Sequence, residues 1–249
     1  MGKVITFEPI DSTNAYLSAH LDLPSGTVVC AEEQTAGRGR LSRHFVSMRG
    51  KGIYLSMLTH LCGVDPDVLP TVTAWVAVAV CDAIESCTGA RPSIKWVNDL
   101  ILDGRKIGGV LNEVVFGDDG APSLITGIGL NVSATAADFP PELSAVAGSL
   151  EMLLCKRVDK EELKASLIVR LEKLFLDFPR ERARYLDAYR RDCITVGRRV
   201  RIISADGETD ATALAVNDDF SLLVTDAKGE QKTVNFGDVS VRGICGYTE

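Results

Sequence analysis

Apolar residues alternate or cluster in short runs over the first half of the chain, and this pattern predicts strands. The runs are residues 4–7, 27–31, 53–58, 94–102, 107–116 and 124–132. Asp103-Gly104 lies between two of these runs, and an Asp-Gly pair between apolar segments predicts a tight hairpin. We therefore expect a sheet with at least one antiparallel pair in this half of the chain.

Three further segments show helical character. Residues 68–87 have a wide apolar face and stop before Gly89, so we expect a buried helix that ends at this glycine. Residues 159–178 place leucine and phenylalanine side chains on one face, after a capping-box-like start at Asp159. The charged residues 180–191 predict another helix that is partly exposed.

The pattern changes near the C-terminal end of the chain. Short apolar runs alternate there with turn signals at Asn217-Asp218 and Lys228-Gly229. This spacing predicts a small all-β barrel or sandwich of about 50 residues. We therefore expect two domains, residues 1–193 and residues 194–249.

Composition narrows the class of protein. The 249 residues are 46% apolar and 24% charged, which is ordinary for a globular protein with a sizeable core. No uninterrupted apolar stretch reaches the roughly 18–20 residues of a membrane helix, and no export signal is visible, so we expect no membrane partner. Seven cysteines without a Cys-x-x-Cys pair predict reduced thiols and a cytoplasmic location.

Charge and histidine content argue against two further classes. The net charge of -7 argues against a general nucleic-acid binder, which normally carries a basic surface, so we expect no DNA partner. The three histidines are far apart in the sequence and form no spaced ligand pair. We therefore expect no metal site built by the protein.

The segment from Gln34 to Arg43 departs from this acidic background. It contains Arg38, Arg40 and Arg43 together with two glycines, a composition that suits neither a helix nor a strand. Glycines let backbone N–H groups approach phosphate, and guanidinium groups bind phosphate with forked donors. The segment predicts a mobile loop that closes when an anion binds; a solvated surface loop is the alternative.

Three other clusters combine polar side chains with apolar surroundings. Ser12-Thr13-Asn14 predicts a helix cap, whose polar groups could also meet a ligand. Lys-Trp-Val-Asn-Asp at 95–99, with Lys106, interrupts an apolar strand pair and is either a structural ion pair or part of a site. Gly-Ile-Gly-Leu-Asn at 127–131 marks either a tight strand crossing or a close approach to a ligand.

The order and spacing of these four clusters resemble those of the biotin protein ligases, also called biotin–[acetyl-CoA-carboxylase] ligases. The resemblance covers nearly the whole chain. It implies an α+β fold, with a mixed, mostly antiparallel sheet packed with helices, of the class II aminoacyl-tRNA synthetase-like type, and a small C-terminal Src-homology-3-like barrel. The matching pattern begins within the first dozen residues, so we expect the monofunctional type without an N-terminal DNA-binding domain.

The resemblance implies a two-step reaction. ATP, accompanied by Mg²⁺, activates biotin as biotinyl-5′-AMP, and biotin then passes to a lysine of a biotin carboxyl carrier protein domain. The carrier domain of a biotin-dependent carboxylase is the expected partner. Family members are monomers or dimers, so a homodimer stays an open alternative.

The resemblance also implies the residues of the site. The expected catalytic residues are Lys106, Arg38, Arg40 and Asp99, with Asp99 acting as a base or as an orienting group. The expected biotin-binding residues are Ser12, Thr13, Asn14, Gln34, Arg38, Gly39, Arg40 and Lys106. The expected ATP-binding residues are Arg38, Arg40, Arg43, Phe45, Lys95, Asn98 and Asn131.

Two rival interpretations remain at this stage. A lipoate ligase or octanoyltransferase shares the catalytic fold, and a non-catalytic sensor of biotin or its adenylate is a binding-protein alternative. The chain also departs from the family pattern at Phe45, where tryptophan is usual. A smaller ring stacks over less of an adenine base.

Overall fold

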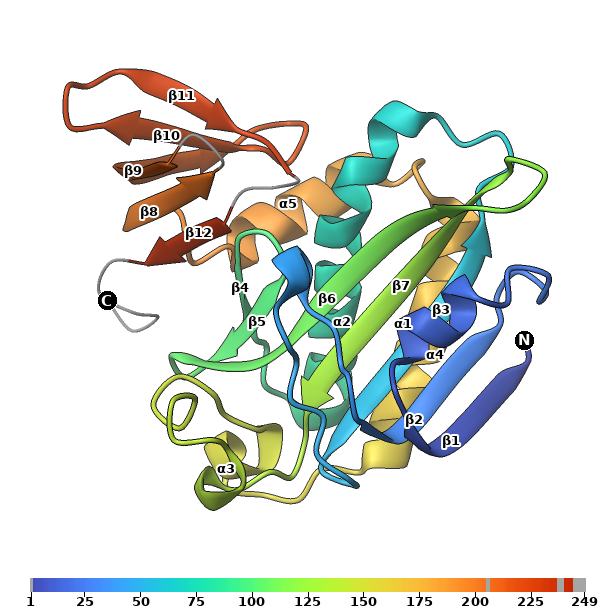
Figure 1. The fold of residues 1–249 in the computed structure, drawn as a ribbon. Helices are drawn as coiled ribbons and strands as arrows, with labels where there is room; N and C mark the ends of the chain where they lie inside the picture. Colours follow the sequence, from blue (N-terminus) through green and yellow to red (C-terminus); the bar gives the residue numbers. More distant parts are fainter. Residues whose placement is uncertain (1, 205–206, 237–239, 244–249) are drawn as a thin grey trace.

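The computed structural model describes residues 2–204, 207–236 and 240–243, and these residues form two sheets (Figure 1). The large sheet has seven strands in the order β1-β2-β3-β7-β6-β5-β4. β1 pairs with β2 in parallel and the other neighbours are antiparallel, so the predicted mixed, mostly antiparallel sheet is confirmed. The strands are β1 (Val4–Ile10), β2 (Val28–Gln34), β3 (Gly52–His60), β4 (Ser93–Lys95), β5 (Asp99–Leu102), β6 (Arg105–Phe116) and β7 (Pro122–Asn131).

Helices cover the two faces of the large sheet unequally. Figure 1 shows α2 (Val72–Thr88) and α4 (Lys160–Asp177) behind the sheet, and the short helix α1 (Thr13–Ser18) in front of it. α5 (Arg182–Asp192) packs against α2, and α3 (Leu150–Leu154) lies near the lower end of the sheet. The front face is therefore left largely to α1 and to the loop between β2 and β3.

The predicted buried helix begins four residues later than expected, at Val72 rather than at residue 68. Residues Pro66–Thr71 form a 3₁₀ helix that contains Pro70. Proline has no N–H to donate and its ring crowds the preceding turn, so an α-helix does not extend back through it. The helix ends as predicted at Gly89, whose φ of 76° closes the last turn.

The expected strand over residues 94–102 is wrong, because the structure divides it into β4 and β5. The backbone between them leaves the sheet: the Trp96 N–H donates to Thr195 Oγ1 at 2.9 Å. The Asn98 side chain instead donates to the Val110 carbonyl at 2.9 Å. These tertiary hydrogen bonds replace the ladder that an uninterrupted strand would form.

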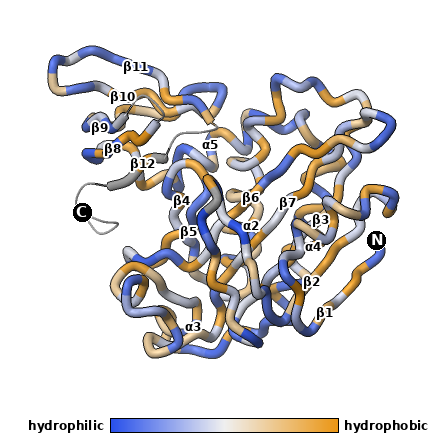
Figure 2. Tube along the Cα trace, in the orientation of Figure 1, coloured by the Kyte–Doolittle hydropathy of each residue, from blue (hydrophilic) through white to orange (hydrophobic). Residues whose placement is uncertain are grey.

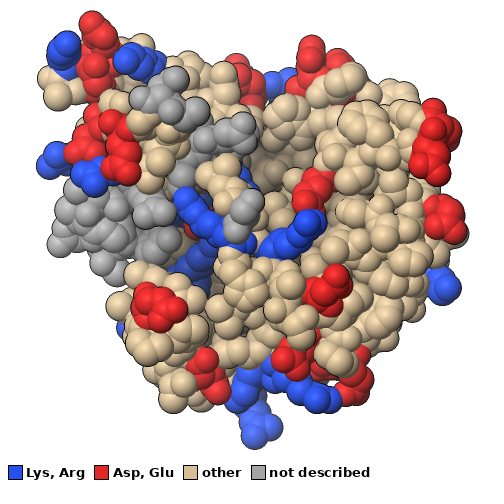
Figure 3. Space-filling view, in the orientation of Figure 1, with Lys and Arg blue, Asp and Glu red and all other residues tan. Residues whose placement is uncertain are grey.

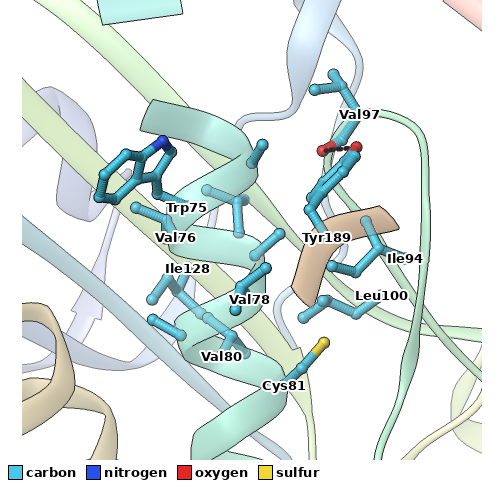
Figure 4. Packing of buried hydrophobic residues seen from close by; sticks show 14 of the residues in the cluster. Trp75, Val76, Val78, Val80, Cys81, Ile94, Val97, Leu100, Ile128 and Tyr189 are labelled. Carbon is cyan, nitrogen blue, oxygen red and sulfur yellow. Dashed lines mark hydrogen bonds between the residues drawn. The ribbon is translucent and has the colours of Figure 1, made fainter. Parts of the chain in front are cut away.

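The core lies between the sheet and α2, with apolar residues along the central strands (Figure 2). Trp75 stacks on Tyr185 with ring centroids 4.3 Å apart. Tyr189 donates its hydroxyl to the Val97 carbonyl at 3.1 Å (Figure 4). The segment Pro66–Thr88 is long and apolar enough to cross a membrane by length and composition alone, but 67% of its apolar window is buried within this core.

The C-terminal sheet has five antiparallel strands in the order β11-β10-β9-β8-β12, in agreement with the predicted all-β unit. Its strands are β8 (Arg199–Ser204), β9 (Gly207–Val216), β10 (Leu222–Asp226), β11 (Gln231–Val234) and β12 (Ser240–Gly243). The fully buried Phe220, between β9 and β10, connects the C-terminal sheet to the rest of the protein. Its ring packs on Tyr189 of α5, and its carbonyl accepts from Trp96 Nε1 at 3.0 Å. The domain division at residue 193 stays a prediction.

We expect Asp159→Ala to lower the free energy of unfolding by about 1 kcal/mol. Asp159 is the N-cap of α4, and its carboxylate accepts from the backbone N–H groups of Glu161 and Glu162. Chemical denaturation measures the loss. Asp159→Asn keeps a capping oxygen, so a loss equal to that of the alanine variant would contradict the capping role.

Candidate active site

A cavity of about 510 Å³ opens on the front face of the large sheet. All of the residues that the sequence predicted for the site line this cavity: Ser12, Thr13, Asn14, Gln34, Arg38, Gly39, Arg40, Arg43, Phe45, Lys95, Asn98, Asp99, Lys106 and Asn131. Figure 3 shows Lys and Arg side chains gathered near the centre of this face. The fold therefore brings four separate sequence clusters to one place.

One end of the cavity is polar and is built on the start of α1. Ser12 is the N-cap, as predicted, and its Oγ accepts from the Ala15 N–H at 3.4 Å. Thr13 donates its backbone N–H to Gln34 Oε1 at 2.9 Å, and its hydroxyl oxygen lies 3.0 Å from the same atom. The Gln34 amide nitrogen donates to Ser47 Oγ at 2.9 Å. These bonds fix the orientation of the Gln34 amide at the cavity wall.

The glycines of β7 make room for side chains of the site. A Cβ at Gly127 would lie 2.3 Å from Asn14 Oδ1, and a Cβ at Gly129 would lie 2.6 Å from the Phe45 ring. Both distances are too short for any larger residue. The sequence predicted a tight strand crossing or a close approach to a ligand at these glycines. The groups that approach them are instead the Asn14 and Phe45 side chains, which themselves line the cavity.

The segment from Gln34 to Arg43, called the arginine loop below, folds back over the cavity. Backbone bonds from the Gly39 N–H to the Arg43 carbonyl (2.7 Å) and from the Phe45 N–H to the Gly37 carbonyl (2.9 Å) hold it as a narrow turn. Arg40 Nη1 donates to Asn98 Oδ1 at 3.4 Å, which connects the loop to the segment between β4 and β5. Arg38 is half-exposed and lies 3.5 Å from the Glu113 carboxylate. Closure of this loop on an anion stays a prediction.

Two lysines share one carboxylate beside the loop. Lys106 Nζ lies 2.6 Å from Asp99 Oδ1, and Lys95 Nζ lies 3.8 Å from Asp99 Oδ2. Burial opposes ionisation of Asp99, but the two ammonium groups outweigh it and hold the pKa of that carboxyl below its ordinary value. One negative charge thus faces two positive charges. The two lysines and the carboxylate together leave a net positive charge on the cavity wall, where an anion would be stabilised.

The other end of the cavity is mostly apolar. Its wall is formed by Phe139, Leu143, Val146 and Ala147, and Val241 of the C-terminal sheet also lines the cavity. Asn131 lies at this wall and donates its amide nitrogen to the Gly148 carbonyl at 3.0 Å. Its buried Oδ1 has no hydrogen-bond partner among the described residues. This end suits a flat, largely apolar group that carries an N–H donor.

Sequence reasoning missed several residues around the cavity. Ser56 and Glu113 hydrogen-bond to the Asn14 side chain from β3 and β6. Their only signal in the sequence was a polar residue inside an apolar strand run. The apolar wall carried no signal, because its members come from segments far apart in the chain and look like ordinary core residues.

Comparison with known proteins agrees with this geometry. The family model described as the Biotin/lipoate A/B protein ligase family matches residues 6–131, and the Biotin protein ligase C terminal domain matches residues 195–242. The chain is 31% identical to the bifunctional ligase/repressor BirA of Bacillus subtilis over 93% of this chain and 72% of that protein. It is 30% identical to the biotin--[acetyl-CoA-carboxylase] ligase of Mycobacterium tuberculosis, over 92% of this chain and 85% of that protein.

A solved structure has the same fold. The biotin protein ligase from Aquifex aeolicus, solved in complex with biotin and ATP, matches with a TM-score of 0.85 at 25% identity, over 98% of this chain and all of that one. The fold is that of the biotin/lipoate ligases. Within this class, the C-terminal domain match and the Mycobacterium tuberculosis relative are named as biotin ligases and not as lipoate ligases. The chain therefore belongs to the biotin protein ligases and is a biotin ligase enzyme.

Proposed function

We propose that this enzyme activates biotin with ATP as biotinyl-5′-AMP and transfers biotin to a lysine of a biotin carboxyl carrier protein domain. The observation that carries the proposal is a single cavity with a polar end, an apolar end and five cationic side chains between them: Arg38, Arg40, Arg43, Lys95 and Lys106. Two anionic substrates must meet in such a reaction. Positive charge placed between their binding ends lowers the cost of that encounter.

The two ends of the cavity suit the two substrates. The polar end, with Thr13 and Gln34, matches the ureido head of biotin, which has one acceptor and two N–H donors. The apolar end matches adenine, whose amino group would donate to the unpaired Asn131 Oδ1. This placement brings the biotin carboxylate and the α-phosphate together beside Lys106 and the arginine loop.

The first step is an attack of one anion on another. A carboxylate oxygen of biotin forms a bond to the α-phosphorus, the bond from that phosphorus to the bridging oxygen breaks, and pyrophosphate leaves. Lys106 and Arg38 would neutralise the carboxylate and the α-phosphate, while Arg40 and Arg43 would hold the adenylate and the departing pyrophosphate. Mg²⁺ enters as part of the ATP substrate, because this ion is usually held by phosphates with few protein ligands.

The second step transfers the acyl group. A neutral lysine amine of the carrier attacks the acyl carbon, the bond from that carbon to the AMP oxygen breaks, and an amide forms with loss of a proton. The intermediate is a mixed anhydride that water can hydrolyse. Closure of the arginine loop over it would exclude water until the carrier arrives.

Four further statements, on domains, location, acceptor and oligomeric state, belong to this proposal. We propose that residues 1–193 form the catalytic domain and residues 194–249 a separate C-terminal domain, which supplies Val241 to the cavity wall. We propose a cytoplasmic location, supported by the six free cysteines of the described segments; Cys245 lies outside them. The acceptor is a carrier domain of a biotin-dependent carboxylase, and a homodimer stays an alternative to a monomer.

The test is a reaction of the whole chain with ATP, Mg²⁺, biotin and a purified carrier domain, followed by mass spectrometry of the carrier. We expect a mass gain of one biotinyl group, and none when the acceptor lysine is replaced by arginine. Calorimetry with biotin and with lipoate, measured separately, tests the substrate. An unmodified carrier, or tighter binding of lipoate than of biotin, would overturn the proposal.

We expect Asp99→Asn to slow adenylate formation by about tenfold, because Lys106 keeps its charge but loses the partner that orients it. Because its pKa is lowered, Asp99 stays ionised even at about pH 4, where an ordinary aspartate takes up a proton. Its ion pairs with the lysines are lost only when the pH falls through that lowered pKa. Pyrophosphate exchange between pH 5 and 9 should therefore show the same profile in both proteins. In transfer of biotin to the carrier, the step that releases a proton, an acidic limb that is present in the parent protein and absent from the variant would instead identify Asp99 as a general base.

A further inference from the structure

Glu113 lies outside the residues that line the cavity, yet it ends a chain of hydrogen bonds that reaches the polar end. Its Oε2 accepts from the Asn14 amide nitrogen at 2.6 Å. Ser56 Oγ lies 2.5 Å from Asn14 Oδ1 and 2.7 Å from Thr13 Oγ1. Asn14, Ser56 and Thr13 are buried, with 4%, 0% and 3% of their surface exposed. These three residues are thus almost inaccessible to water, whereas the Glu113 side chain is 32% exposed.

The carboxylate decides the direction of every bond in this chain. An ionised carboxylate only accepts, so the Asn14 amide must turn its NH₂ toward Glu113 and its oxygen toward Ser56. Ser56 has one proton, and the Asn14 oxygen can only accept, so Ser56 donates to Asn14. Ser56 can then meet the Thr13 hydroxyl only as an acceptor, so the one hydroxyl proton of Thr13 goes to Ser56, and Thr13 donates to Gln34 Oε1 with its backbone N–H alone. Without the carboxylate, the Asn14 amide could turn over and reverse this order.

We propose that Glu113 is a positioning residue for the head group of biotin. It acts through Asn14 and Ser56 to fix which groups at the polar end of the cavity donate and which accept. This inference rests on the proposed function, since it assigns the polar end to the ureido head of biotin. Gly127 contributes to the same positioning of Asn14, because any side chain at this residue would displace the Asn14 amide.

The position of Glu113 supports this role over a purely structural one. The carboxylate also lies 3.5 Å from Arg38, whose side chain is 52% exposed. An ion pair with so exposed a partner contributes little to folding stability. The bond to the buried Asn14 amide is short and charge-assisted, which makes it the stronger of the two contacts.

The test is calorimetry of biotin binding without ATP. We expect Glu113→Gln to weaken biotin binding by about tenfold, the usual effect of losing a hydrogen bond to a charged group. Ser56→Ala, which breaks the same chain at its next link, should weaken biotin binding to a similar extent. ATP binding, measured separately, should not weaken in either variant, whereas a general defect in folding would weaken both ligands.

Two matched controls accompany these variants. Glu32 is a strand carboxylate of similar exposure that pairs with Lys160, outside the cavity, and Ser123 is a buried strand hydroxyl that contacts His60. Glu32→Gln and Ser123→Ala should bind biotin like the parent protein.

A double-mutant cycle identifies the route. If Glu113 acts through Asn14, Glu113→Gln should change biotin binding less than twofold in an Asn14→Ala background. Biotin binding by Glu113→Gln within twofold of the parent protein, or losses that add in full with Asn14→Ala, would overturn the inference. Failure of the parent protein itself to bind biotin would instead overturn the proposed function, so the two results are distinguishable.

Discussion

Lys106→Ala should reduce biotin-dependent exchange of pyrophosphate into ATP by roughly 100-fold to 1000-fold while the protein still folds. The Lys106 ammonium lies on the cavity wall at 2.6 Å from Asp99, where the carboxylate of biotin and the α-phosphate are proposed to meet. Its removal leaves the Asp99 charge less compensated and adds repulsion toward both substrates. The loss therefore falls on the chemical step and on substrate binding together.

Lys160→Ala is the matched control for this prediction. Lys160 is similarly exposed and also pairs with one carboxylate, Glu32, at 2.9 Å, but it does not line the cavity. Its replacement should leave pyrophosphate exchange near the parent rate. Near-parent exchange by Lys106→Ala, with normal thermal unfolding, would contradict the assigned role.

Arg40→Ala should release biotinyl-5′-AMP on the order of 100-fold faster than the parent enzyme. The guanidinium of Arg40 contacts Asn98 at the cavity wall and so connects the loop to the segment between β4 and β5. Without it, the loop would lose the forked contact that we propose it makes with the adenylate phosphate. Released adenylate would acylate lysines of any nearby protein, which can be measured as biotin incorporated into serum albumin.

Arg49→Ala provides the control for loop charge. Arg49 follows the arginine loop, pairs with Glu8 at the surface and does not line the cavity. We expect no biotin on serum albumin with this variant. If Arg40→Ala kept its adenylate and labelled only the carrier, the loop would have no part in retaining the intermediate.

Local patterns predicted much of the fold. The Asp103-Gly104 turn forms with φ values of 45° and 71°, as the sequence pair requires, and it delivers Lys106 to the cavity. Ser12 and Asp159 cap their helices as their positions predicted. These features depend on a few neighbouring residues, so the local sequence is enough to specify them.

Local patterns failed where a distant segment supplied the partner. The strand expected over residues 94–102 breaks because Thr195 and Val110 bind the chain between β4 and β5. The glycines of β7 face Asn14 and Phe45, which come from the first fifth of the sequence. No alternation of apolar and polar residues records such contacts, because each partner lies many residues away.

The sequence by itself determined most of the elements, the capped starts of α1 and α4, and most of the charged and polar groups that meet in one cavity. Only the tertiary structure decided how these groups act on one another: that Asp99 is shared by two lysines, and that Glu113 orients Asn14 from outside the cavity. The physical reason is the distance along the chain over which each interaction acts. Backbone preferences and caps act over a few residues, whereas ion pairs and buried hydrogen bonds depend on distances that exist only after the sheet has formed.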